Sequence, residues 1–197
     1  MSMEIPKVKV FAYLAFIMPI FFSTMWILSA TMDGRWTFGV NSLSDMGISE
    51  NATSAFLFNF GCIFTGIFGA MIGFGMFAYG RRTNKASGLL YIVSMIFLAL
   101  VGVFTLPQTM HYVVATSYGL FFGLSVLVSS VSDWRLSWYP YFDIVYIVFS
   151  IIVVGTQVFE MWEPIMVIAA MFWTVITGYK MMHEKGLYDE EPNLRLV

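Results

Sequence analysis

The chain has 197 residues, of which 59% are hydrophobic and only 11% are charged, and its mean hydropathy is +0.79. Soluble domains carry about 25% charged residues, so this composition indicates a protein whose solvent is lipid. The net charge of −2 argues against nucleic acid as a partner, and the single cysteine, Cys62, excludes a disulfide within the chain.

Six stretches are long and apolar enough to cross a bilayer, which takes about 20 residues. We predict helices over residues 8–30, 52–79, 87–106, 109–131, 138–159 and 162–182. The first stretch is longer than the apolar region of a signal peptide, so we expect it to be retained. The length fits one domain. The sequence therefore predicts an all-α integral membrane protein, a six-transmembrane-helix bundle that forms a single membrane domain over residues 1–197.

The distribution of Lys and Arg predicts the orientation, because short cytoplasmic loops are rich in both. All the basic residues except one fall on one side of the predicted topology: Lys7, Lys9, Arg81, Arg82, Lys85, Arg135, Lys180, Lys185 and Arg195. Only Arg35 falls on the other side. We predict that the N-terminus and the C-terminus are both cytoplasmic, that residues 184–197 form a polar cytoplasmic tail, and that the protein lies in the cell membrane.

Two predicted helices carry glycines one helical turn apart. Gly69 and Gly73 form one such step, and Gly119 and Gly123 form another. Small residues at this spacing let helix backbones approach closely. The pattern predicts close packing of the second helix with the fourth within one chain, with a homodimer through these glycine-rich helices as the alternative.

Polar groups at membrane depth are costly and are therefore candidates for function. Those predicted near the outer face come from separate parts of the chain: Ser42, Ser44, Asp45, Asn59, Gln108, His111 and Gln157. We predict that they line an outer-leaflet pocket whose other walls are Phe and Met, and that the pocket binds a lipid or a small amphiphile.

Two other classes of function stay open. A carboxylate beside an imidazole fixes the imidazole tautomer and raises its basicity. A lipid-modifying enzyme would use His111 as general base, Asp45 to orient it and Ser44 as nucleophile. The structural interpretation is that Asp45 and His111 cap turns or helices. The third class is a membrane scaffold or assembly protein with no small-molecule chemistry.

The sequence predicts no metal and no cofactor. Its two histidines, His111 and His183, fall on opposite sides of the predicted membrane, so a three-histidine zinc site cannot be built. A site for a hard cation formed by Asp45, Glu160 and Glu163 is a weaker alternative.

Two charged residues fall inside predicted helices near the cytoplasmic side. Asp143 is interpreted as structural, because an ion pair with Arg81, Arg82 or Arg135 would lower the cost of its burial. Lys180 is expected to extend its ammonium group to the membrane interface.

Short motifs carry a family resemblance. The segment Ser44-Asp45-Met46-Gly47, followed by Phe58-Asn59 and Gly66, resembles the second-helix signature of a prokaryotic family, the domain of unknown function nine-nine-eight. The run Gly102-Val103-Phe104, then His111 and Phe121-Phe122, resembles its third and fourth helices.

The resemblance covers most of the chain. The chain is also distantly similar to DRAM-type six-helix membrane proteins, in which a Ser-Asp-x-Gly stretch precedes the second helix and a histidine opens the fourth. The resemblance implies a compact six-helix bundle and an outer-side cluster of Ser44, Asp45, Asn59 and His111. It implies no reaction.

Overall fold

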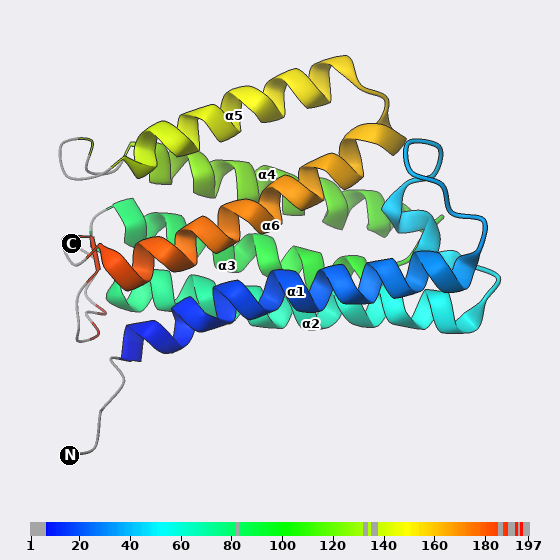
Figure 1. Cartoon of the computed structure of the whole chain (residues 1–197), viewed down its shortest axis with the longest axis horizontal. Helices are drawn as coiled ribbons and strands as arrows, with labels where there is room; N and C mark the ends of the chain where they lie inside the picture. The colour runs from blue at the N-terminus through cyan, green and yellow to red at the C-terminus, as the bar shows by residue number, and fades with distance from the viewer. Residues whose placement is uncertain are drawn as a thin grey trace.

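The computed structural model describes residues 7–81, 83–131, 134, 138–184, 187, 188, 192 and 194. Within them the elements are α1 (Lys7–Asp33), the 3₁₀ helix η1 (Leu43–Ile48), α2 (Ala52–Tyr79), α3 (Thr83–Val101), α4 (Thr109–Ser130), α5 (Tyr139–Thr156) and α6 (Phe159–His183). The six α-helices are long and apolar enough to cross a membrane (Figure 1). This confirms the predicted all-α, six-helix membrane protein.

The largest difference in helix boundaries is at α3, which covers Thr83–Val101 instead of the predicted 87–106. The helix ends where its backbone meets α2. A side-chain carbon on Gly102 would lie 2.4 Å from the carbonyl oxygen of Asn59. The chain turns there into the loop that leads to α4, and this loop holds Phe104 and Pro107.

Part of the orientation prediction rests on residues that lie outside the described ones, namely Arg82, Arg135, Lys185 and Arg195. Most of the predicted tail does too. Leu187 and Tyr188 are described and buried, and the Arg81 N–H donates to the Leu187 carbonyl at 3.0 Å. The cytoplasmic location of both termini stays a prediction.

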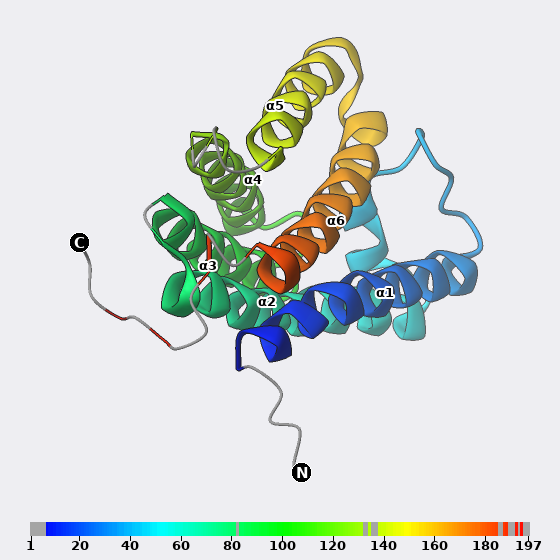
Figure 2. The same cartoon turned by 60° about the vertical axis from the view of Figure 1, so that its left-hand side comes forward.

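The main backbone contacts between the helices form a closed circuit. The order around the circuit is α1, α2, α3, α4, α5 and α6, and α6 returns to α1 (Figure 2). η1 lies at the end of the bundle where α1 ends and α2 begins, and it contacts α1, α2 and α6. We call this end the η1 end.

Aromatic side chains fill the interior of the circuit about midway along the helices. Tyr91, Phe122 and Trp173 lie with ring centroids 5.4–5.7 Å apart. The Tyr91 hydroxyl also bonds the Thr174 hydroxyl at 2.9 Å. This cluster packs α3, α4 and α6 against one another at mid-depth.

The two glycine steps have different surroundings. A side-chain carbon on Gly69 would lie 2.3 Å from the Met95 sulfur, and one on Gly73 would lie 2.8 Å from Ile92, so both glycines pack against α3. The predicted pairing of the second helix with the fourth is therefore wrong. At Gly119 and Gly123 nothing lies within 4 Å. The homodimer stays a prediction.

Asp143 and Lys180 face the interior of the bundle. The Asp143 Oδ1 accepts a hydrogen bond from the Trp173 indole at 2.7 Å, and Lys180 lies within electrostatic range. The Lys180 ammonium donates to the Ser129 hydroxyl at 3.2 Å, and only 3% of the lysine is exposed. The expectation that Lys180 extends to the interface is therefore wrong, because polar groups inside the bundle receive its ammonium.

Candidate functional site

Ser42 and Asp45 hold η1 together. The Ser42 hydroxyl accepts from the Asp45 N–H at 3.2 Å, and the Asp45 carboxylate accepts from the Ser42 N–H at 2.8 Å. This reciprocal arrangement is a capping box, which satisfies two backbone donors at the start of a helix. Asp45 therefore has the structural use that its position in a Ser-Leu-Ser-Asp segment indicates.

Glu163, in the second turn of α6, joins that helix to η1. One carboxylate oxygen accepts from the Leu43 N–H at 2.7 Å, and the other accepts from the Ser44 hydroxyl at 3.0 Å. These contacts span about 120 residues of sequence. They fix both carboxylate oxygens, and they place Glu163 beside one of the predicted site residues.

His111 lies in the first turn of α4 and is buried. Its Nδ1 lies 2.7 Å from the Phe104 carbonyl oxygen. Since a carbonyl oxygen only accepts hydrogen bonds, Nδ1 carries the proton in this contact. The other ring nitrogen, Nε2, has no hydrogen-bond partner among the described residues.

The three remaining predicted residues lie elsewhere at the same end. The Asn59 amide donates to the Gly47 carbonyl at 2.9 Å and so ties α2 to η1. Its oxygen is buried and has no partner among the described residues. Gln108 and Gln157 are exposed at the start of α4 and the end of α5.

A cavity of about 570 Å³ opens inside the circuit at the η1 end. This volume lies within the range of about 300–1,000 Å³ that is usual for small-molecule sites. Polar side chains from three elements line its outer part, which we call the polar end: Ser44, His111 and Glu163. Most of the remaining wall is apolar or aromatic and includes Phe22, Leu98, Phe122, Met166, Val167 and Ala170.

Of the seven predicted ligand-binding residues, the structure brings Ser44 and His111 to the cavity wall. Ser42, Asp45, Asn59, Gln108 and Gln157 do not line it. Ser42, Asp45 and Asn59 instead shape η1, the element that presents Ser44.

Sequence reasoning named Glu163 only in the weaker alternative of a cation site and missed Tyr112, although both line the cavity. Glu163 falls at a predicted helix boundary, where an acidic residue is ordinary, since carboxylates favour helix N-termini. The available signal is its distance from the start of α6. Glu163 follows Phe159, the first residue of the helix, by four positions, so its carboxylate belongs to the helix itself.

Within the described part of the chain, Asp45 and His111 make no hydrogen bond to each other. Asp45 bonds Ser42, His111 bonds Phe104, and the Ser44 hydroxyl donates to Glu163. The catalytic roles assigned to the three residues stay a prediction. The described residues also contain no group of three or more His, Cys, Asp or Glu side chains placed to hold a metal.

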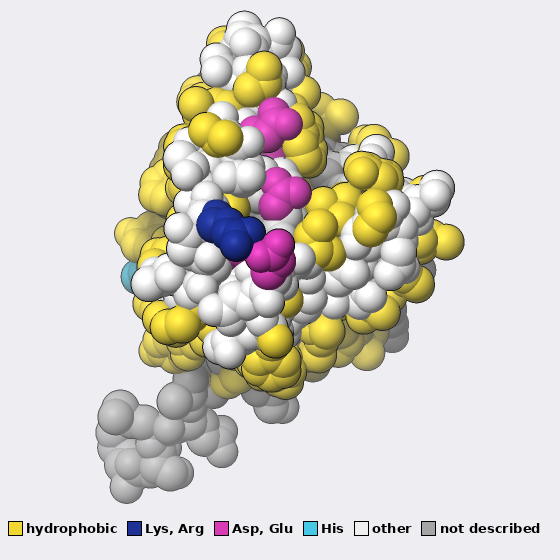
Figure 3. All heavy atoms as spheres, turned by 90° about the vertical axis from the view of Figure 1, so that its right-hand side faces the viewer, with side chains coloured by type: hydrophobic (Ala, Val, Ile, Leu, Met, Phe, Trp, Pro, Cys, Tyr) yellow, Lys and Arg dark blue, Asp and Glu magenta, His cyan; other side chains and the backbone are white. Residues whose placement is uncertain are grey.

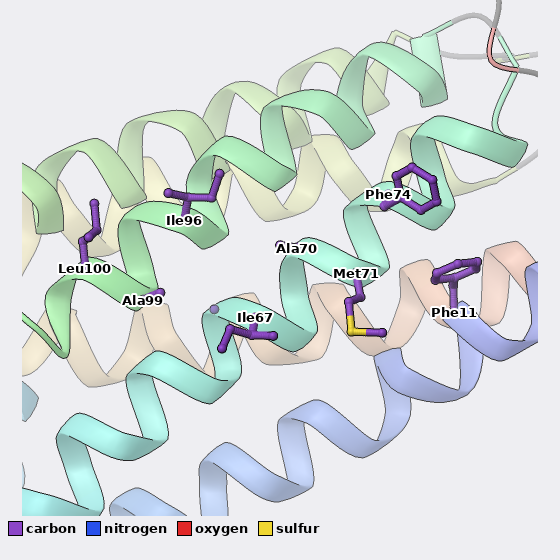
Figure 4. Close-up of a pocket in the computed structure, with 9 residues that line it drawn as sticks. Phe11, Ile67, Ala70, Met71, Phe74, Ile96, Ala99 and Leu100 are labelled. Atoms are coloured by element: carbon purple, nitrogen blue, oxygen red, sulfur yellow. The ribbon is translucent and has the colours of Figure 1, made fainter.

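A second hollow, of about 630 Å³, lies on the outer flank of α1, α2 and α3 (Figure 4). Its side chains are entirely apolar and include Phe11, Ile67, Met71, Phe74, Ile96 and Leu100. A specific site for a small molecule needs a few convergent polar groups to orient the ligand. This flank has none among its lining side chains, so the interior cavity is the better candidate.

A comparison with protein families gives one match. The family described as protein of unknown function (DUF998) matches residues 16–183.

The chain belongs to the DUF998 family.

No curated protein and no solved structure shows a significant match.

The DUF998 match includes η1 and α2 to α5 entirely, with most of α1 and all of α6. Every residue that lines the interior cavity lies within it. The resemblance predicted from the short motifs is thereby confirmed for this family, while the likeness to DRAM-type proteins stays a prediction. A DUF998 protein has no activity assigned through its family, so its function has to be argued from the chemistry of its site.

Proposed function

We propose that this protein binds one lipid or other membrane amphiphile in the interior cavity. The observation that carries the proposal is the division of the cavity wall into two zones. Ser44, His111 and Glu163 gather at the η1 end, while apolar side chains reach from there to Phe122 at mid-depth. An amphiphile matches this division, because its head group finds hydrogen-bond partners while its chain stays out of water.

Part of the cavity wall is exposed on the outer surface of the bundle. Three residues of its wall, Tyr112 and Leu120 on α4 and Val154 on α5, are about half exposed. Figure 1 shows α4 and α5 close together at the left and farther apart toward the η1 end on the right. An amphiphile entering sideways between these two helices would not have to leave the membrane.

The site lies in the outer leaflet if both termini are cytoplasmic. Among the described residues, Arg35 is the single basic residue at the η1 end, whereas Lys9, Arg81, Lys85 and Lys180 lie toward the other end. This asymmetry supports the proposed orientation. In the cell membrane, which we propose as the location, this orientation turns the polar end outward.

Filling the cavity tests the proposal. Gly119 lines the cavity, and an added side-chain carbon there has nothing within 4 Å, so we choose Gly119→Leu to add an isobutyl group at the cavity wall. We expect the lipid retained per protein after purification in mild detergent, counted by mass spectrometry, to fall at least about fivefold, because the volume is occupied. The fold should be kept.

Gly155→Leu is the matched control, because Gly155 also has open space around it but does not line the cavity. It should retain the same lipid as the wild type. Equal retention by the wild type and Gly119→Leu would contradict binding in this cavity. Absence of any lipid from the wild type, even after incubation with a total membrane lipid extract, would contradict the function itself.

A further inference from the structure

The proton positions at the polar end show what kind of group it accepts. Because His111 Nδ1 donates to Phe104, a neutral imidazole leaves the lone pair of Nε2 free to accept. His111 lines the cavity, so this acceptor is available to a ligand there.

Glu163 adds acceptors of the same kind. Its two carboxylate oxygens accept from η1, and a carboxylate has lone pairs left for further donors. The Ser44 hydroxyl gives its proton to Glu163, and the Ser150 hydroxyl gives its proton to the Tyr146 carbonyl at 2.7 Å. Glu163, the Ser44 and Ser150 hydroxyl oxygens and His111 Nε2 are therefore acceptors in the cavity wall.

The charge around the polar end has one sign. Within the part of the chain that the structure describes, no Lys or Arg lines the cavity. Asp45 lies within electrostatic range of Glu163. Arg35, on the surface of the η1 end, is already paired with Glu50 at 2.7 Å. Figure 3 shows this face, with acidic side chains beside its basic one. A negatively charged head group would be repelled here, and a cation would be attracted.

Two aromatic rings from the start of α6 share the cavity wall with Glu163. Phe159 and Trp162 line the cavity, and their ring centroids lie 5.1 Å apart. The faces of such rings favour a nearby cation. A cation that also carries N–H groups can donate hydrogen bonds to the acceptors, and it is attracted by both the acidic groups and the aromatic rings.

We propose that the head group bound at the polar end is a protonated amine, with its N–H groups directed to Glu163 and to His111 Nε2. This deepens the proposed function and rests on it. The amine belongs either to a single-chain ammonium amphiphile or to the ethanolamine head of a zwitterionic lipid, since both present the same donors.

The test is a head-group series on the full-length protein in detergent. Tetradecylamine, tetradecyltrimethylammonium, tetradecanol and tetradecanoic acid share one chain, and each apparent Kd follows from the rise of the unfolding temperature with ligand concentration. We expect the amine to bind at least about tenfold more tightly than the alcohol, because hydrogen bonds to charged groups are the strong ones. The trimethyl compound, which has no N–H, should bind more weakly than the amine, and the acid should bind most weakly.

Glu163→Gln removes the charge and keeps the shape, so the preference for the amine over the alcohol should fall to about onefold to threefold. Glu160→Gln, which changes an acid on the same helix outside the cavity wall, should keep the preference. If Glu163→Gln does not fold, the wild-type series still decides. Comparing the affinity for phosphatidylethanolamine with that for phosphatidylcholine separates the two sources of the amine, because a site for the ethanolamine head group should prefer the first lipid.

Equal affinity for all four head groups, or tightest binding of the acid, would overturn the amine proposal while leaving lipid binding in place. Failure of every compound to bind would instead overturn the proposed function. A preference for the amine that Glu163→Gln leaves unchanged would overturn the role of this carboxylate.

Discussion

Asp143 lies inside a membrane-spanning helix, yet its surroundings are polar. Its Oδ1 accepts from the Trp173 indole at 2.7 Å, and Lys180, whose ammonium bonds Ser129, lies within electrostatic range. These residues come from α4, α5 and α6. Opposite charges brought together inside a bundle tie helices to one another, and their removal one at a time is more harmful than their removal together.

We predict that Asp143→Ala lowers the free energy of unfolding by about 3 kcal/mol, because it leaves the buried Lys180 ammonium without this carboxylate. The double variant Asp143→Ala, Lys180→Met should recover most of that loss, because it removes both charges. Unfolding titrations in mixed detergent micelles measure both values. A double variant as unstable as the single one would show that the two residues do not depend on each other.

At the scale of elements, the contrast between the two sides of the bundle decides where a ligand fits. α2 and α3 touch through their backbones, and a side-chain carbon on Gly66 would lie 2.5 Å from the Met95 carbonyl oxygen. On α4, Gly119 and Gly123 face open space. The α2–α3 side is therefore a rigid wall, and the α4–α5 side holds the cavity.

We predict that Gly66→Ala destabilises the protein by about 1–3 kcal/mol, because the added methyl group meets backbone atoms that cannot rotate away. Gly155→Ala, where nothing lies within 4 Å, should be neutral or slightly stabilising, since alanine favours the helix. Thermal unfolding of the two variants beside the wild type measures the difference. Equal stability of both variants would mean that α2 and α3 separate at little cost.

At the scale of the whole molecule, the two ends differ in charge. Among the described residues, the η1 end carries Asp33, Asp45, Glu50, Glu160 and Glu163 and a single basic residue, Arg35. Lys9, Arg81, Lys85 and Lys180 lie toward the other end. The same difference supports the proposed orientation, because cytoplasmic loops are rich in Lys and Arg. It also supports the proposed preference for a cationic ligand, because acidic groups around the cavity attract a cation.

We predict that a cysteine at Thr37 reacts with a membrane-impermeant maleimide on intact cells, and that a cysteine at Leu194 reacts only after lysis. Both residues are exposed, and the native Cys62 is buried, so background labelling is low. The reverse pattern would place the termini outside and the cavity in the inner leaflet.

Much of the fold was predictable from the sequence, and less of the site was. Each apolar run fits the bilayer independently of the other runs, so its length and composition are enough to identify it as a spanning helix. The basic residues likewise predict an orientation from their place in the sequence, and this orientation stays a prediction. Ser44 and His111 were predictable as site residues, since buried polar groups at membrane depth are few.

The sequence by itself determined that the protein is a six-helix membrane protein and that several polar groups fall near the same end of its helices. Only the tertiary structure decided which of them share a cavity. Gly69-Gly73 and Gly119-Gly123 have the same spacing, yet one pair is packed and the other lines a void. Glu163 meets Ser44 across 119 positions. The physical reason is that hydropathy acts on each segment separately, whereas such contacts depend on the rotation and order of helices, which no single segment encodes.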